Sequence, residues 1–267
     1  MTIYWHELKS LRKSTVIWTL VLVGIAALYL SIYPSMASEA TDFRKLLAGY
    51  PPAIRAMLGI DLDQMTSLLG FYAFIFSFVV LCGAIQAMHV GASILSKEQR
   101  ARTADFLLAK PVSRGQIATA KLLAALTTVV LTDAVYAVLA YLLAHAVEKA
   151  DFSSRLFVLI TLSLLFVQII FLTLGAALSV IFYRLKNVLP LSLGVVFAFY
   201  IAGALLASGR HAEVARYLSP FQYFRANDIL RQSGYEWQYV LAGTLIVGAG
   251  TVLTYWLYIY RDAQAVN

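Results

Sequence analysis

Four polar side chains interrupt long apolar stretches of the sequence, where such groups are rare. They are Gln86, His89, Asp133 and Gln168. An ionisable group near the middle of a bilayer costs at least about 2.5 kcal/mol on insertion scales, so Asp133 must face the protein interior or water. Two interpretations fit this residue. It either lines a substrate or proton pathway, or it accepts a hydrogen bond from Gln168, Thr127 or Tyr136.

Catalytic chemistry has little support in the pattern of these residues. Gln86 and His89 are three residues apart and share one helix face, where a single histidine is more typical of packing than of ligation. An intramembrane enzyme using His89 and Asp133 is the weaker alternative, because the two residues fall at different depths; a non-catalytic membrane regulator is another. The sequence has no metal-ligand cluster and no G-x-x-x-x-G-K-S/T phosphate loop. We therefore expect no cofactor or metal on this chain.

The composition indicates that membrane-spanning helices position these groups. Of the 267 residues, 61% are hydrophobic and 13% are charged, and the mean hydropathy is +0.76. Soluble proteins carry about 25% charged residues, so this chain cannot cover a water-facing surface. Six apolar stretches have the roughly 20 residues that a crossing requires. They are residues 15–33, 68–96, 122–147, 156–183, 188–207 and 239–260. We expect one all-α, polytopic membrane domain over residues 1–267.

The distribution of Lys and Arg predicts the orientation of these spans. Twelve of the 21 basic residues lie on one side, in the N-terminus, the loop 97–121, the short fourth connection and the C-terminus. The positive-inside rule therefore places both termini in the cytoplasm. The net charge of +7 then reflects topology in a lipid bilayer, and we expect no nucleic-acid partner.

Residues 3–14 have the pattern of an amphipathic helix at the membrane surface. Ile3, Tyr4, Leu8 and Leu11 fall on one face at helical spacing. The other face carries charges, namely Glu7, Lys9, Arg12 and Lys13. The segment is either an interfacial helix or a charged flank that anchors the first span.

The loop 97–121 contains an apolar cluster among charges. Phe106, Leu107 and Leu108 form the cluster, and Pro111 ends any helix that contains them. Ser113 with Gln116 forms a capping box that can start the third span. These residues predict a short helix, folded against the membrane surface or docked into a partner.

The same loop resembles the cytoplasmic loop of ABC-2 type ABC transporter permeases. The matching residues are Glu98, Thr103, Leu107, Leu108, Pro111, Arg114 and Lys121, with Arg102 where the family usually has a glycine. The six-span layout, the amphipathic N-terminus and the sequence Ser219-Pro220-Phe221-x-Tyr223-Phe224 are also similar to that family.

The resemblance implies a permease subunit of a bacterial ABC exporter in the plasma (inner) membrane. Its loop would carry a coupling helix for a separate ATP-binding subunit, a dimer that would hold ATP and Mg. A second permease copy, identical or a paralogue, would complete the pathway. The residues expected to couple are Glu98, Arg100, Arg102, Thr103, Phe106, Leu107, Leu108, Pro111 and Arg114.

The segment 208–238 between the last two spans is aromatic and apolar in its middle, residues 217–229. That composition fits a helix that dips into the outer leaflet, as the resemblance suggests, or an ordinary interfacial aromatic belt. The residues expected in such a re-entrant element are Ser219, Pro220, Phe221, Tyr223 and Phe224.

Overall fold

The computed structural model describes residues 2–51, 54–55, 64, 67–100, 112–148, 151–182, 187–207 and 216–260. Within these ranges the chain is helical, with no strand. The elements are α1 (Thr2–Ser38), α2 (Ala40–Ala48), α4 (Leu68–Arg100), α6 (Arg114–Val147), α7 (Ser154–Ile181), α8 (Val188–Ala207), η1 (Pro220–Gln222), α10 (Ala226–Gln232) and α11 (Trp237–Tyr260).

Six of these helices are long and apolar enough to cross a membrane, which confirms the predicted fold class. They are α1, α4, α6, α7, α8 and α11. Two of them start well before the apolar runs that predicted them. The third span begins at Arg114 because Ser113 caps it: the Ser113 hydroxyl accepts from the Gln116 amide and the Gln116 side chain accepts from the Ser113 amide, both at 3.2 Å.

The first helix runs without interruption from Thr2 to Ser38, so the N-terminal segment is continuous with the first span. Its first turns are amphipathic as predicted. The apolar face is half-buried and Lys9, Arg12 and Lys13 are exposed. Glu7 differs from the prediction, because this residue is only 2% exposed, whereas the other charged residues of the polar face are exposed.

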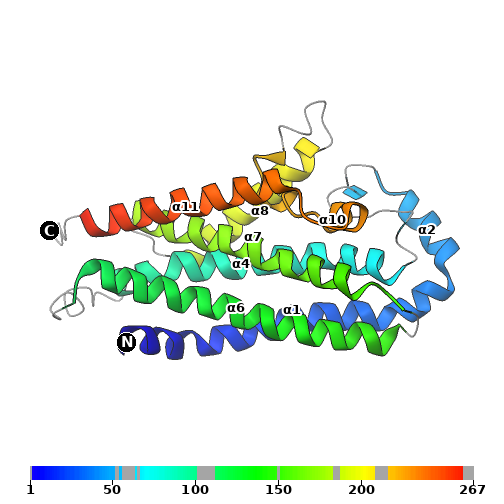
Figure 1. Cartoon of the computed structure of the whole chain (residues 1–267), viewed down its shortest axis with the longest axis horizontal. Coiled ribbons are helices and arrows are strands. Elements are labelled where there is room, and N and C mark those ends of the chain that lie inside the picture. Colours follow the sequence, from blue (N-terminus) through cyan, green and yellow to red (C-terminus); the bar gives the residue numbers. More distant parts are fainter. Residues whose placement is uncertain are drawn as a thin grey trace.

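The spans are arranged in three layers (Figure 1). Helices α4 and α7 form the middle layer, α1 and α6 cover one side of it, and α8 and α11 cover the other. The first turn of α1, the last turn of α4, the first turn of α6 and the last turn of α11 lie at one end of the bundle, called here the N-terminal end. Helices α2 and α10 lie at the opposite end (Figure 1).

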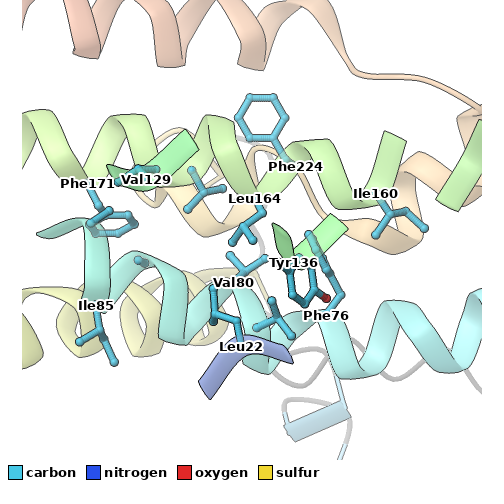
Figure 2. Close-up of a cluster of buried hydrophobic side chains, with 14 of the residues drawn as sticks. Leu22, Phe76, Val80, Ile85, Val129, Tyr136, Ile160, Leu164, Phe171 and Phe224 are labelled. Atoms are coloured by element: carbon cyan, nitrogen blue, oxygen red, sulfur yellow. The ribbon is translucent and has the colours of Figure 1, made fainter. Parts of the chain in front are cut away.

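The core lies where α4 and α7 meet α1 and α6. Figure 2 shows Leu22, Val80, Val129 and Leu164, one from each of these four helices, converging in this core. Glycines allow the two central helices to pack backbone against backbone. A Cβ atom on Gly175 would lie 2.4 Å from the Met88 carbonyl oxygen, and Cβ atoms in proteins essentially never approach another heavy atom this closely. Only glycine therefore fits at this helix contact.

The last span carries exposed tryptophans near both ends. Trp237 is 75% exposed and Trp256 is 58% exposed. At 1.5 Å per residue they are separated by about 28 Å, close to the roughly 30 Å of hydrocarbon in a bilayer. Because tryptophan concentrates at membrane interfaces, these two positions fit the two surfaces of the membrane.

Candidate functional site

At the N-terminal end, an ionic cluster joins three helices. The Glu7 carboxylate of α1 pairs with Lys97 near the end of α4 and, at 3.2 Å, with Lys121 in the second turn of α6. Lys121 is fully buried and also donates to the Ile94 carbonyl at 2.8 Å. We call Glu7, Lys97 and Lys121 the ionic clamp. It lies beside both ends of the segment 101–111, which contains most of the expected coupling residues.

The start of α6 also contacts the end of α11. The Tyr255 hydroxyl donates to Thr119 Oγ1 at 2.8 Å, and Arg114 Nη1 lies 3.5 Å from the Ile259 carbonyl oxygen. The first turns of α6 are therefore held on two sides, by α1 through the ionic clamp and by α11.

Most of the expected coupling residues lie outside the described residues. These are Arg102, Thr103, Phe106, Leu107, Leu108 and Pro111. Glu98 and Arg100 lie in the last turn of α4, where only the backbone is described, and Arg114 is the first residue of α6. The coupling assignment of these residues therefore stays a prediction.

In the middle of the bundle, polar side chains pair across α4, α6 and α7. With its amide nitrogen facing the carboxylate, Gln168 of α7 donates to both oxygens of Asp133 on α6, at 2.9 and 2.7 Å. The fully buried Gln86 of α4 donates to Thr132 at 3.0 Å. His89 lies one turn further along α4 and is half-buried.

A third polar contact lies nearer the opposite end. The Tyr72 hydroxyl of α4 lies 3.1 Å from that of Tyr136 on α6 and 2.9 Å from Thr161 Oγ1 on α7. Of the three partners considered for Asp133, the structure selects Gln168, while Tyr136 contacts Tyr72 and Thr127 contacts Tyr4. This geometry supports the helix-pairing interpretation of Asp133.

Replacing Asp133 separates pairing from proton transfer. In Asp133→Asn, an amide still accepts from Gln168, so we expect a change in unfolding free energy within about 1 kcal/mol. Asp133→Leu leaves the Gln168 amide buried without a partner and should cost about 1–3 kcal/mol. Thermal unfolding in detergent measures both. If the Asn variant keeps its stability but loses transport, Asp133 acts in the pathway rather than in pairing.

At the opposite end, Arg216 organises the segment between the last two spans. Its guanidinium donates to Asp228 at 3.0 Å and Glu236 at 2.9 Å, and to the Gln222 carbonyl oxygen at 3.2 Å. The same group stacks 4.1 Å from the centre of the Tyr239 ring. One cation thereby links η1, α10 and the start of α11.

This segment packs into the bundle with its aromatic side chains. The Ser219 hydroxyl donates to the Phe199 carbonyl of α8 at 2.8 Å, beside Gly203, where a Cβ would lie 2.6 Å from Ser219 Oγ. Phe221 and Phe224 face Phe171 and Phe166 of α7, with ring centroids 5.0 and 5.2 Å apart. The chain here forms two short helices, η1 and α10, joined by Tyr223–Arg225.

Tyr235 fastens the end of the same segment to α7. Its hydroxyl donates to the Leu159 carbonyl oxygen at 2.6 Å. Burial raises the pKa of Tyr235 to about 12. The phenol therefore stays protonated and keeps this hydrogen bond throughout the physiological pH range.

Sequence reasoning missed the ionic clamp and the Arg216 contacts. Helical spacing placed Glu7 on the charged face of residues 3–14, and no sequence pattern singled out Arg216. One signal was present: Lys121 sits at the start of an apolar run, where an unpaired ammonium would be costly. Among the described residues, no group of His, Cys, Asp and Glu is placed to hold a metal ion.

Six apolar helices that pack together and share buried polar contacts define a multi-pass membrane protein. The family model described as ABC-2 family transporter protein matches residues 1–263, so the chain belongs to that family. It is therefore a transmembrane permease component of an ABC transporter, a transport component that is not itself catalytic. No curated protein matches the sequence.

Proposed function

We propose that this permease component docks a separate ATP-binding subunit through the segment 98–114 and moves its cargo outward. Family membership supports an ATP-driven partner, and the chain's own sequence lacks a phosphate loop. The docking site is supported by the position of the two ends of the segment 98–114. The last turn of α4 and the first turn of α6 lie together at the N-terminal end, tied by the ionic clamp.

The proposed assembly has two permease copies and two ATP-binding subunits, which hold ATP and Mg, in a bacterial plasma membrane. Helices α1, α8 and α11 have at most 28% of their apolar windows buried within one chain, so this surface is open to a second copy as well as to lipid. Exposed Lys9, Arg12 and Lys13 at the N-terminal end support a cytoplasmic location for that end and both termini.

Replacing Phe106 and Leu107 with Asp tests the docking site. Apolar anchors in the centre of an interface typically contribute about 2 kcal/mol or more, so we expect affinity for the ATP-binding subunit to fall at least about 30-fold. The measurement is recovery of that subunit with tagged permease from detergent-solubilised membranes, after the wild-type permease has been used to identify it.

The matched control is Leu46→Asp. Leu46 is 62% exposed and lies on α2, a helix at the opposite end of the bundle. We expect this variant to recover the ATP-binding subunit as the wild type does. Normal recovery with the Phe106→Asp and Leu107→Asp variants, each still monodisperse by size-exclusion chromatography, contradicts the docking assignment.

A further inference from the structure

The ionic clamp is buried to a degree that surface ion pairs do not reach. Glu7 and Lys121 have side chains that are 3% and 0% exposed, and Lys97 is 29% exposed. Both carboxylate oxygens are used, since Oε2 accepts from Lys97 and Oε1 faces Lys121. The Ile94 carbonyl takes a further proton of Lys121. One glutamate thereby serves two lysines from two other helices.

A buried ionic cluster contributes little net stability to the folded protein. The cost of removing the charges from water is comparable to their attraction, and apolar side chains of similar volume often do as well or better. An ionic cluster differs from apolar packing in fixing one relative position, because the atoms pair only in one arrangement. The function of the ionic clamp is therefore inferred from which helices it joins.

The clamp joins the parts of the chain that bound the proposed docking segment. Lys97 lies in the last turns of α4, which ends at Arg100, and Lys121 lies in the second turn after the Ser113 cap of α6. Glu7 lies in the second turn of α1, and Tyr4 one turn earlier contacts Thr127 of α6 at 3.1 Å. Any displacement of α4 or α6 at this end must move α1 or break these pairs.

We propose that Glu7 is a positioning residue for coupling: its carboxylate fixes the ends of α4 and α6 to α1, so that the three move as one body when the ATP-binding subunit pushes on them. This inference rests on the proposed function, because the push comes from that subunit. It adds a role for α1, which the docking residues alone do not involve.

Distance measurement by spin labels tests the clamp directly. In a Cys82→Ala background, one label replaces Ser10, exposed on α1, and the other replaces Val112, just before the α6 cap. We expect a narrow distance distribution that ATP leaves unchanged in the reconstituted complex. In Glu7→Gln the distribution should broaden, and stimulation of ATP hydrolysis by the permease should fall about tenfold, within the usual range of coupling between sites.

Two further variants separate positioning from folding. Glu7→Gln removes the Glu7 charge from beside the buried ammonium of Lys121, so it can unfold the protein. Glu7→Gln combined with Lys121→Met removes both buried charges at similar volume, so we expect near-normal thermal stability with coupling still lost. Glu39→Gln changes an exposed glutamate between α1 and α2, at the opposite end of the bundle, and should behave as the wild type.

The outcomes distinguish the clamp from the proposed function. Normal coupling and a narrow distribution in the folded double variant overturn the positioning role. Failure of the wild-type permease to recover any ATP-binding subunit overturns the proposed function, and the positioning role with it. In that case labels on the isolated permease still report whether Glu7 holds α1 against α6 as a structural contact.

Discussion

Gly175→Val is expected to abolish the packing of the two central helices. A Cβ atom at this position would lie 2.4 Å from the Met88 carbonyl oxygen and 2.9 Å from the Ala92 nitrogen, both backbone atoms of α4. Backbone cannot turn aside as a flexible side chain can, so α4 and α7 must separate. Overpacking costs typically 1–3 kcal/mol, and we expect about 3 kcal/mol or more here. Because proteins are stable by only about 5–15 kcal/mol, this loss removes a large fraction of the stability and should lower the unfolding temperature clearly.

Gly248→Val is the matched control for this substitution. Gly248 is also a helical glycine, but it lies on α11, where a Cβ would meet nothing within 4 Å. We expect its thermal unfolding in detergent to match that of the wild type, while Gly175→Val unfolds at a lower temperature and shows a larger aggregated fraction in size-exclusion chromatography. Equal stability of the two variants would show that α4 and α7 do not approach this closely.

The glycine contact illustrates what the sequence could predict and what it could not. Lipid exposure imposes long apolar runs, so the six spans were recognisable from hydropathy alone. Gly175, Ala176 and Ala177 form a run of small residues in the sequence, a pattern typical of close contacts between membrane helices. The residues of α4 that Gly175 contacts could not be predicted from the sequence, because they depend on how α4 and α7 cross each other.

Contacts of charged residues with other helices were also not predictable from the sequence. Helical periodicity placed Glu7 among the charges of α1, and that placement was wrong because two lysines from other helices neutralise it. Helical periodicity describes the faces of a single helix, so it cannot identify the residues of other helices that contact it. For Asp133 the outcome was better, since three partners were considered and Gln168 was among them. The choice among the three depended on the packing of α6 and α7.

The described polar contacts are distributed over the length of the bundle. The ionic clamp holds the N-terminal end, Asp133 with Gln168 and Gln86 with Thr132 hold the middle, and Arg216 holds the opposite end. Polar pairs between membrane helices contribute modest energy each, on average about 0.6 kcal/mol in one measured system. The first three contacts join α1, α4, α6 and α7 to one another, and the Arg216 contacts join α10 to the start of α11.

Arg216→Met is expected to release the segment between the last two spans. The substitution takes the arginine partner from the Glu236 carboxylate, and it leaves Asp228 with Arg225, whose Nε lies 2.7 Å from Asp228 Oδ2. Removing one partner of a buried pair costs about 3–5 kcal/mol. These side chains are 13–24% exposed, so we expect a smaller loss, about 2–3 kcal/mol. Hydrogen exchange of the α10 amides should accelerate, because α10 loses its link to the start of α11.

A double-mutant cycle with Glu236→Gln isolates the pair itself. If Arg216 and Glu236 act together, the two substitutions should couple by about 1–2 kcal/mol, because the second removes a group that the first has already left unpaired. Arg155→Met, an exposed arginine at the start of α7, serves as the control and should leave exchange in α10 unchanged. Additive effects in the cycle, with α10 protected as in the wild type, would mean that the aromatic contacts of Phe221 and Phe224 hold this segment without Arg216.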